Sequence, residues 1–128
     1  MIDPALIRIT GFRIGEDRGR LLENVVFLHI RMQKKEIYFH KDKKECDFII
    51  REGNRIIYAI QVTTTLSNEE VKTREINGLI EAMSLYNLQE GTILTENEQG
   101  SLEIDGFFIS IIPIWKWLLF NPTNSSSI

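Results

Sequence analysis

The chain has 128 residues, 43% of them hydrophobic and 26% charged, and its formal net charge is −3. This composition excludes a disordered chain and is typical of one globular domain with its own core. The acidic balance excludes a general basic surface for nucleic acid, so such binding needs a local patch. The single cysteine, Cys46, excludes an intramolecular disulfide and fits the cytoplasmic location that we expect. No apolar run has membrane-spanning length, and we expect no membrane partner.

The N-terminal part of the chain is predicted to be helical in two places. Asp3-Pro4 is a helix-start pair, so a short helix is expected over residues 5–9. A longer helix is expected over residues 16–33, where apolar residues occur almost all round the helix, which indicates burial on more than one side. Glu23 lies on this apolar surface, where a carboxylate is costly unless it is paired, protonated or bound to a metal. Two roles are open for Glu23: a salt bridge, with Arg20 for example, or a functional group.

A first strand is expected over residues 37–41, and lysines surround it. They are Lys34, Lys35, Lys41, Lys43 and Lys44. The two interpretations of this cluster are a solvated turn and a local patch that binds DNA.

Residues 45–62 are predicted to form a β-hairpin around which the rest of the chain is organised. Two apolar runs flank a turn that contains Gly53-Asn54. Asp47 stands at the start of the first run and Gln61 near the end of the second. A three-residue loop would place these two side chains on one face, and an even loop would separate them, because a one-residue slip exchanges the faces. Two such oxygen-bearing side chains on one face indicate a site for a hard cation, whereas polar residues at strand ends are also commonly solvated.

The second half of the chain is predicted to alternate helices and strands. A helix with a capping box at Ser67 and Glu70 is expected to run to about residue 86. Strands are expected at residues 91–95, 102–104 and 107–112, and a terminal helix at residues 114–120. Trp115 and Trp117 cannot share a helix face, so one ring is expected in the core and the other nearer the surface, with base stacking as the functional alternative. We expect one domain over residues 1–120 and a flexible polar tail over residues 121–128.

Several short stretches, in their order and spacing, resemble a known family. They are Asp3-Pro4, Gly19-Arg20-Leu21-Leu22-Glu23-Asn24, Glu45-Cys46-Asp47-Phe48, Ile60-Gln61-Val62, Arg74-Glu75-Ile76, Gly91-Thr92-Ile93-Leu94-Thr95 and Pro113-Ile114-Trp115-Lys116-Trp117-Leu118-Leu119. Together they resemble the nuclease-like C-terminal domain of a group of prokaryotic AAA-type ATPases, over nearly the full chain. The resemblance implies the PD-(D/E)XK nuclease superfamily, with an α/β (α+β) restriction-endonuclease-like fold: a mixed β-sheet flanked by helices, in the core order αβββαβ plus an extra hairpin strand and a C-terminal helix. The chain has no phosphate-binding loop motif, so it is expected to be the C-terminal part of such a protein, with the ATPase domain as its partner.

The resemblance also carries over site residues one by one. Glu23 matches the helix glutamate of the superfamily, Asp47 its metal-binding aspartate and Gln61 its Glu/Gln position. These three are the candidate catalytic residues and the candidate ligands of Mg²⁺, with Mn²⁺ as a surrogate. The lysine that stabilises or orients the attacking water matches Thr63, which cannot supply a positive charge. Lys72 or Lys44 could replace it from another element.

Three functions are consistent with these residues, and whether the chain is an enzyme is left open by the missing lysine. The first is a catalytically degenerate nuclease-fold module of an ATPase, which acts in substrate or partner recognition. The second is a Mg²⁺-dependent DNA endonuclease with a relocated lysine. The third is a protein-interaction or oligomerisation domain in which the three site residues are relics.

Overall fold

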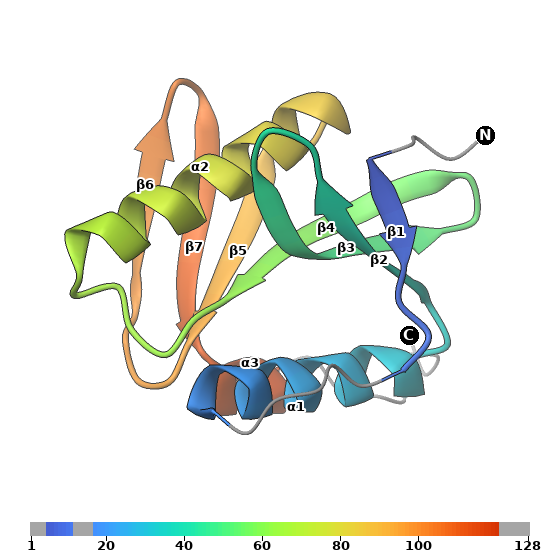
Figure 1. Cartoon of the computed structure of the whole chain (residues 1–128), viewed down its shortest axis with the longest axis horizontal. Helices are drawn as coiled ribbons and strands as arrows, with labels where there is room; N and C mark the ends of the chain where they lie inside the picture. The colour runs from blue at the N-terminus through green and yellow to red at the C-terminus, as the bar shows by residue number, and fades with distance from the viewer. Residues whose placement is uncertain (1–4, 12–16, 121–128) are drawn as a thin grey trace.

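Seven strands form a single mixed sheet in the order β1-β2-β3-β4-β5-β7-β6 in the computed structural model, which describes residues 5–11 and 17–120. Helix α2 covers one face of this sheet, and helices α1 and α3 lie together against the other face (Figure 1). The strands are β1 (Leu6–Arg8), β2 (Glu36–Lys41), β3 (Glu45–Glu52), β4 (Arg55–Val62), β5 (Glu90–Thr95), β6 (Gly100–Ile104) and β7 (Phe107–Pro113), and the helices are α1 (Arg18–Met32), α2 (Glu69–Leu85) and α3 (Ile114–Leu119). The expectation of a mixed sheet flanked by helices is therefore confirmed.

The central strands have the predicted connectivity. Strands β2, β3 and β4 are antiparallel neighbours, and β5 pairs parallel with β4 after the crossover through α2. Strand β7 continues the sheet parallel to β5, and β6 pairs antiparallel with β7 at the edge. The order α1-β2-β3-β4-α2-β5 is thus the expected αβββαβ order, with β6 and β7 as the extra pair.

The sheet separates two apolar cores because alternate residues of each strand face opposite helices. The core under α2 includes Tyr38, Cys46, Ile49, Ala59, Leu79, Met83 and Ile93. The core under α1 and α3 includes Val26, Phe27, Ile30, Phe48, Ile60, Leu94 and Trp117. Burial of both faces explains why β3 to β5 have nearly continuous apolar runs.

The prediction of a short helix over residues 5–9 is wrong. Residues Leu6–Arg8 instead form strand β1, which pairs antiparallel with β2, so that Leu6 lies opposite His40. A helix of five residues gains too few hydrogen bonds to offset its nucleation cost, whereas an edge strand satisfies its backbone on β2. Asp3-Pro4 lies outside the described residues.

The hairpin turn is shorter than a three-residue loop. Glu52 pairs with Arg55, so only Gly53 and Asn54 form the loop, and Gly53 has a positive φ of 64°. This even loop alone would separate Asp47 from Gln61. A bulge follows, however, and it shifts the register so that Phe48 pairs with Ile60.

The helices agree with prediction in position and differ from it in two details. Helix α2 is capped by Asn68, whose side chain accepts from the Val71 amide, and not by Ser67. Helix α1 is not buried on more than one side: one stripe faces the sheet and the opposite stripe is exposed. Trp117 is buried against His29 and Trp115 is exposed, which confirms the prediction for the two tryptophans. Among the described residues, none of the three helices combines the length and the hydropathy that a bilayer-spanning helix needs.

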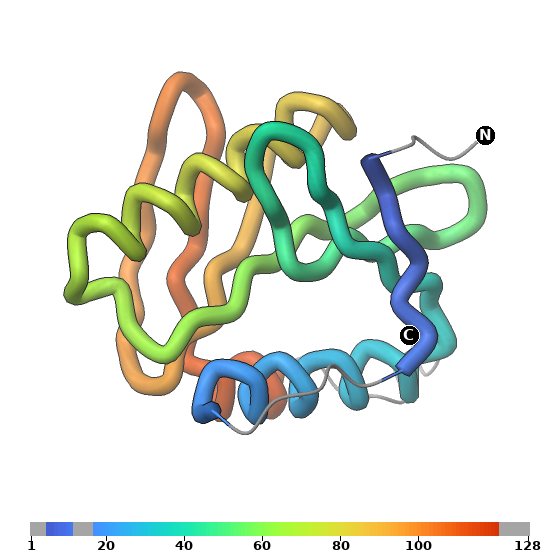
Figure 2. Tube along the Cα trace, in the orientation of Figure 1, coloured from blue at the N-terminus to red at the C-terminus, as the bar shows by residue number. Residues whose placement is uncertain are grey.

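Two loops meet at the end of the sheet where β4 and β5 finish. Figure 2 shows the segment after β4 running beside the segment after β5. The Thr63 amide donates to the Leu94 carbonyl at 2.9 Å, and the Glu96 amide donates to the Thr64 carbonyl at 3.2 Å. The Glu98 carboxylate accepts from the Leu66 amide at 2.7 Å and from the Thr65 hydroxyl. These bonds fix the segment that follows Gln61.

Candidate functional site

The candidate site lies where strands β3 and β4 separate. Their last backbone pair is Phe48 with Ile60, and the next residues, Asp47 and Gln61, are not paired through their backbones. Each strand continues beyond this point beside its other neighbour, β3 beside β2 and β4 beside β5. Parting strands leave backbone donors and acceptors that need other partners.

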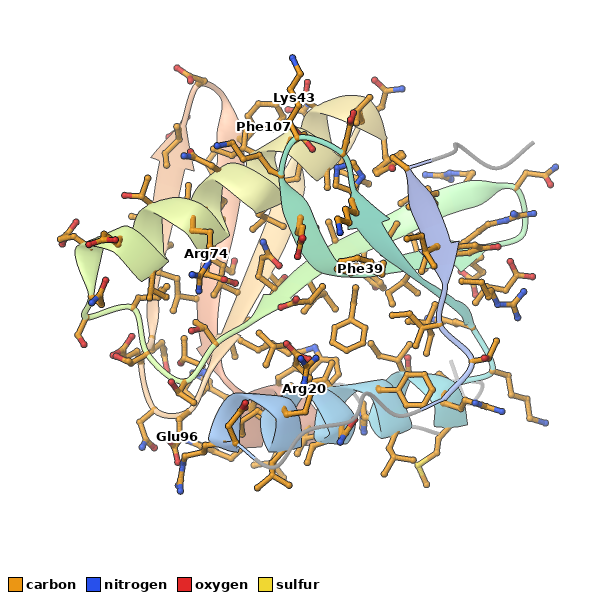
Figure 3. All side chains as sticks on the ribbon, viewed as in Figure 1. Arg20, Phe39, Lys43, Arg74, Glu96 and Phe107 are labelled. Atoms are coloured by element: carbon orange, nitrogen blue, oxygen red, sulfur yellow. The ribbon has the colours of Figure 1, made fainter. Side chains whose placement is uncertain are left out.

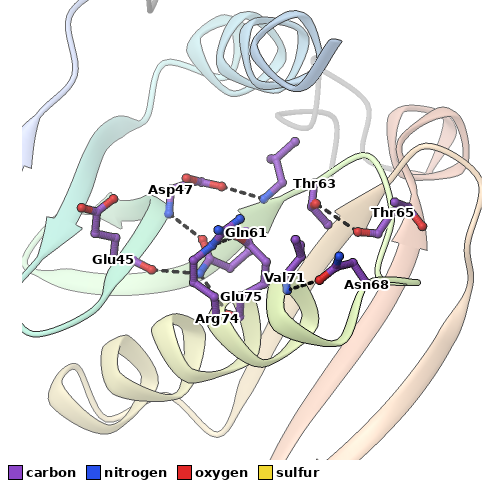
Figure 4. Close-up of polar contacts among 10 residues, drawn as sticks. Glu45, Asp47, Gln61, Thr63, Thr65, Asn68, Val71, Arg74 and Glu75 are labelled. Carbon is purple, nitrogen blue, oxygen red and sulfur yellow. Dashed lines mark hydrogen bonds and ion pairs between the residues drawn. The ribbon is translucent and has the colours of Figure 1, made fainter. Parts of the chain in front are cut away.

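Gln61 supplies those partners from its side chain. It is 2% exposed, and its Oε1 accepts from the Asp47 amide at 2.8 Å. Its Nε2 donates to the Glu45 carbonyl at 2.9 Å and to the Glu75 carbonyl at 3.0 Å (Figure 4). Both amide hydrogens of Gln61 are therefore used, and the side chain joins β3, β4 and α2.

Asp47 makes the reciprocal bond across the same gap. Its Oδ2 accepts from the Val62 amide at 2.8 Å. The side chains of Asp47 and Gln61 thus replace the next rung of the β3–β4 ladder. The sequence left metal ligation and solvation open for these two side chains, and in the structure both bind backbone instead.

A polar pocket of about 640 Å³ opens at this gap. Its lining residues come from α1, the β2–β3 turn, both parting strands and α2: Asp17, Gly19, Arg20, Glu23, Lys43, Lys44, Glu45, Asp47, Gln61, Val62, Thr63, Thr64, Arg74 and Glu75. The three predicted site residues, Glu23, Asp47 and Gln61, all line this pocket, although the amide of Gln61 is bound to backbone. In Figure 3, Arg20 stands on α1 and Arg74 on α2, on the two sides of the sheet.

Glu23 contributes to the pocket as half of an ion pair. Its Oε1 lies 2.9 Å from Nη1 of Arg20, one helical turn earlier in α1. The salt bridge expected as its structural role is therefore present. The pair also explains how a carboxylate with only 15% of its side chain exposed is tolerated on this helix.

The position expected to hold a lysine has no cation. The Thr63 hydroxyl donates to the Thr65 carbonyl at 3.2 Å. Of the two proposed replacements, Lys44 lines the pocket, whereas Lys72 lines a separate hollow beside Ser67 and Glu98.

The five lysines do not form one patch. Lys34 and Lys35 precede β2, while Lys41, Lys43 and Lys44 lie at and beyond its other end. At ~3.3 Å per residue, this six-residue strand holds the two groups about 20 Å apart. Only Lys43 and Lys44 reach the pocket.

Glu75 is a site residue that sequence reasoning missed. Its side chain is 13% exposed, and its Oε1 is a buried atom without a hydrogen-bond partner. Burial raises the pKa of the Glu75 carboxyl, an effect that Arg74 opposes and that the nearby carboxylates of Glu23 and Glu45 reinforce. A signal for this residue was present in the sequence. Glu75 lies one turn before Gly78, a buried position of α2, so its carboxylate is on the side of the helix that faces the sheet.

Replacing Glu75 with glutamine is expected to stabilise the fold at neutral pH. Because its pKa is raised in the folded state, the Glu75 carboxyl contributes most to stability below its ordinary pKa of 4.5. That contribution to the free energy of unfolding is lost as pH rises through the folded-state pKa. Removing the charge should therefore raise the free energy of unfolding at pH 7 by about 1 kcal/mol, the scale of an unsatisfied buried polar group. Urea denaturation at pH 7 and pH 4 measures this, and the gain should shrink at pH 4.

The exposed Glu70 of the same helix provides the control for this prediction. Glu70→Gln should show no gain, because its carboxylate lies in the first turn of α2, where a negative charge is favourable. A destabilised Glu75→Gln protein at pH 7 would mean that the charged carboxylate is favourable where it lies.

The groups present do not form a ready metal centre. Within residues 5–11 and 17–120, no three His, Cys, Asp or Glu side chains are grouped so that they could hold a metal ion. Gln61 does not fit as a ligand, because its amide is bound to three backbone groups. Cys46 lies beneath this point in the core, and burial, reinforced by Asp47, raises the pKa of its thiol well above the usual range. A protonated buried thiol is not a nucleophile.

Comparison with known proteins gives relatives without a described function. The chain is 35% identical over 116 residues to the uncharacterized protein MJ1544 of Methanocaldococcus jannaschii, a match that covers 82% of this chain and 26% of that protein. It is 29% identical over 120 residues to an uncharacterized protein of Haemophilus influenzae, covering 93% of this chain and 28% of the relative. The chain therefore spans about a quarter of the length of these relatives. No solved structure matches it significantly. Residues 18–117 match the model of a domain of unknown function, DUF4143, and the chain belongs to that family.

Proposed function

We propose that the chain is a nuclease-like module of an AAA-type ATPase that has lost hydrolytic chemistry and acts in recognition of a substrate or partner. The observation that supports this best is the bonding of Asp47 and Gln61. Both side chains bind the backbone of the parting strands, so the pair that would hold a divalent cation in a restriction-endonuclease-like enzyme has a structural role. The αβββαβ order and the convergence with Glu23 support descent from such an enzyme.

The missing charge at Thr63 supports the same proposal. Hydrolysis of a phosphodiester needs charge stabilisation in the transition state, and losing one positioned group costs about 10²–10³ in rate. A threonine hydroxyl that donates to a neighbouring carbonyl supplies no such charge. The residues present do not fit a Mg²⁺ centre with Gln61 as a ligand, so no catalytic step is assigned to that ion.

The domain is therefore expected to leave supercoiled plasmid DNA intact in Mg²⁺ or Mn²⁺. The wild-type protein and Asp47→Ala should both show only the background rate of nicking on an agarose gel. Thr63→Lys alone should also stay inactive, because it restores the cation and leaves Gln61 bound to backbone. Robust cleavage of the plasmid by the wild-type protein that the Asp47→Ala substitution abolishes would contradict the proposal that the module is catalytically degenerate.

A second candidate is a Mg²⁺-dependent endonuclease with a relocated lysine. The observation that favours it is the presence of Lys43 and Lys44 in the same pocket as Asp47 and Glu75. If the plasmid assay shows cleavage, Lys44→Ala and Lys43→Ala should reduce it by about 10²-fold or more, on the scale of one lost transition-state charge. Lys34→Ala is the matched control, because that lysine lies beyond the opposite end of β2.

A further inference from the structure

A second pocket lies on the face of the sheet that helix α3 covers only in part. Helix α3 has six residues and spans about 9 Å, whereas strand β7, which precedes it, has seven residues and spans about 23 Å. Part of this face therefore stays open, and Phe108 on β7 is 52% exposed there. The hollow between α3 and the strands measures about 520 Å³.

Small side chains make this hollow. Its floor is formed by Thr92 on β5 and Ser110 on β7, which are register partners, and by Ile60 beside Thr92 on β4. Gly100 at the start of β6 adds no side chain, and a Cβ atom there would meet only Ile111 Cδ1, at 4.0 Å. Larger residues at these positions would fill the space, so the sequence itself leaves this part of the sheet hollow.

The walls of the pocket are aromatic. They include Trp117 of α3, Phe120 at its C-terminal cap and Tyr58 of β4. Trp117 is 9% exposed and its ring contacts His29, so it is held in place. A pocket of roughly 300–1,000 Å³ with a mainly apolar and aromatic lining and a few polar groups is typical of small-molecule sites. Aromatic walls favour flat ligands, which meet them by stacking or edge to face.

One cation gives the pocket its charge. Among the described residues that line it, Lys116 alone is charged. Its Nζ donates to Gln99 Oε1, a neutral acceptor, at 3.3 Å, and no carboxylate of the described residues forms an ion pair with it. Glu90 and Glu103 are register partners of Phe108, one step further from α3 than the floor. An anionic group is therefore attracted to the α3 end of the pocket.

The floor adds hydrogen-bond donors that the protein does not use. The hydroxyls of Thr92 and Ser110 make no hydrogen bond to another described residue. A hydroxyl can donate to an anionic oxygen, and hydrogen bonds to ionised groups are stronger than neutral ones. Together with the Lys116 ammonium, these hydroxyls form a donor set that fits a carboxylate.

We propose that this pocket binds a small aromatic acid, whose flat ring lies between α3 and the sheet and whose carboxylate is bound at Lys116. The aromatic walls specify the ring, and the single cation specifies the anion. No described residue lines both this pocket and the polar pocket at Gln61, so the inference is independent of the function proposed for that pocket.

An isotope-edited NMR titration of the whole chain tests the proposal with four probes. Three share one ring system: 2-naphthoate, the neutral 2-naphthamide and the cation 2-naphthylmethylammonium. The fourth, decanoate, replaces the ring with an aliphatic chain. We expect 2-naphthoate to shift the amide resonances of Thr92, Gly100 and Ser110 and the indole resonance of Trp117. The other three probes should bind at least tenfold more weakly, since the amide and the cation lack the anionic acceptor and decanoate lacks the ring.

Matched variants locate the anion at Lys116. Lys116→Gln should weaken 2-naphthoate at least tenfold and leave 2-naphthamide unchanged, whereas Lys116→Arg should keep the preference for the anion. Lys41→Gln is the control, because that exposed lysine ends β2 and does not line the pocket. Ser110→Phe should exclude all four probes, and the exposure of Ser110 allows the larger side chain without disturbing the core. Resonances away from the pocket report whether each variant is folded.

Four outcomes would overturn the proposal. They are the absence of shifts in the pocket at millimolar 2-naphthoate, equal binding of 2-naphthoate and 2-naphthamide, tighter binding of decanoate than of 2-naphthoate, and shifts that cluster around Arg20 and Lys44 instead. The second outcome would make the hollow a purely apolar surface, and the third would assign it to an aliphatic chain. The fourth would place the anion in the polar pocket.

Discussion

Replacing Gly78 with alanine is expected to lower the free energy of unfolding by about 3 kcal/mol or more, the scale of a severe packing conflict. A Cβ atom at this position would lie 2.0 Å from the Glu45 carbonyl oxygen and 2.7 Å from Nε2 of Gln61. The first of these atoms belongs to the backbone of β3 and cannot turn away. Helix α2 must therefore move from the sheet, and the bonds of Gln61 to β3 and α2 must lengthen or break. Urea denaturation measures the loss.

Gly19→Ala is the matched control for this prediction. Gly19 also lies in a long helix, but its added Cβ would meet only Asp17 Oδ1, at an ordinary contact distance of 3.4 Å. This substitution should stabilise the protein by up to ~1 kcal/mol, because alanine is the better helix former. A gain at both positions would show that α2 is not held as close to β3 as the structure places it.

The element order could be predicted because it depends on local signals. The apolar runs of the hairpin, the one-sided stripe of α2 and the turn at Asp105-Gly106 each specify their own segment. Strand β1 could not be predicted in this way, since its pairing with β2 depends on residues 30 or more positions away. The exposure of the α1 stripe was hidden for a similar reason: an all-round apolar helix does not reveal which side remains without a partner.

The members of the site could be predicted better than their roles. Glu23, Asp47 and Gln61 were found from their unusual positions, and all three line one pocket. The salt bridge of Glu23 with Arg20 was among the predicted roles, whereas the partners of Asp47 and Gln61 were not foreseen, because they are backbone groups whose availability depends on where β3 leaves β4. Glu75 was missed as a site residue although its position one turn before Gly78 indicated the inner side of α2, and the burial of one of its oxygens depends on tertiary packing that the sequence does not show.

Gln61→Glu is expected to destabilise the fold at pH 7 by about 3–5 kcal/mol, the scale of an uncompensated buried charge. The new carboxylate oxygen would replace the Nε2 donor and face the carbonyl oxygens of Glu45 and Glu75. Burial would raise the pKa of this carboxyl, so the deficit should be smallest at low pH and grow as pH rises. Gln61→Ala is the control: it leaves the same backbone groups unpaired and adds no charge, so its smaller loss should be nearly independent of pH.

Magnesium separates the structural role of Gln61 from a role in a metal site. If position 61 faced a divalent cation, Gln61→Glu would add a carboxylate ligand. Millimolar Mg²⁺ would then raise the thermal midpoint of the variant by more than it raises that of the wild type. Because the Gln61 side chain points at the backbone of β3 and α2, we expect no such rise. The thermal midpoints of the wild type, Gln61→Glu and Gln61→Ala, each measured with and without Mg²⁺ at pH 7, decide between the two. A rise in the thermal midpoint confined to Gln61→Glu would assign position 61 to a metal centre. It would then favour the endonuclease over the degenerate module.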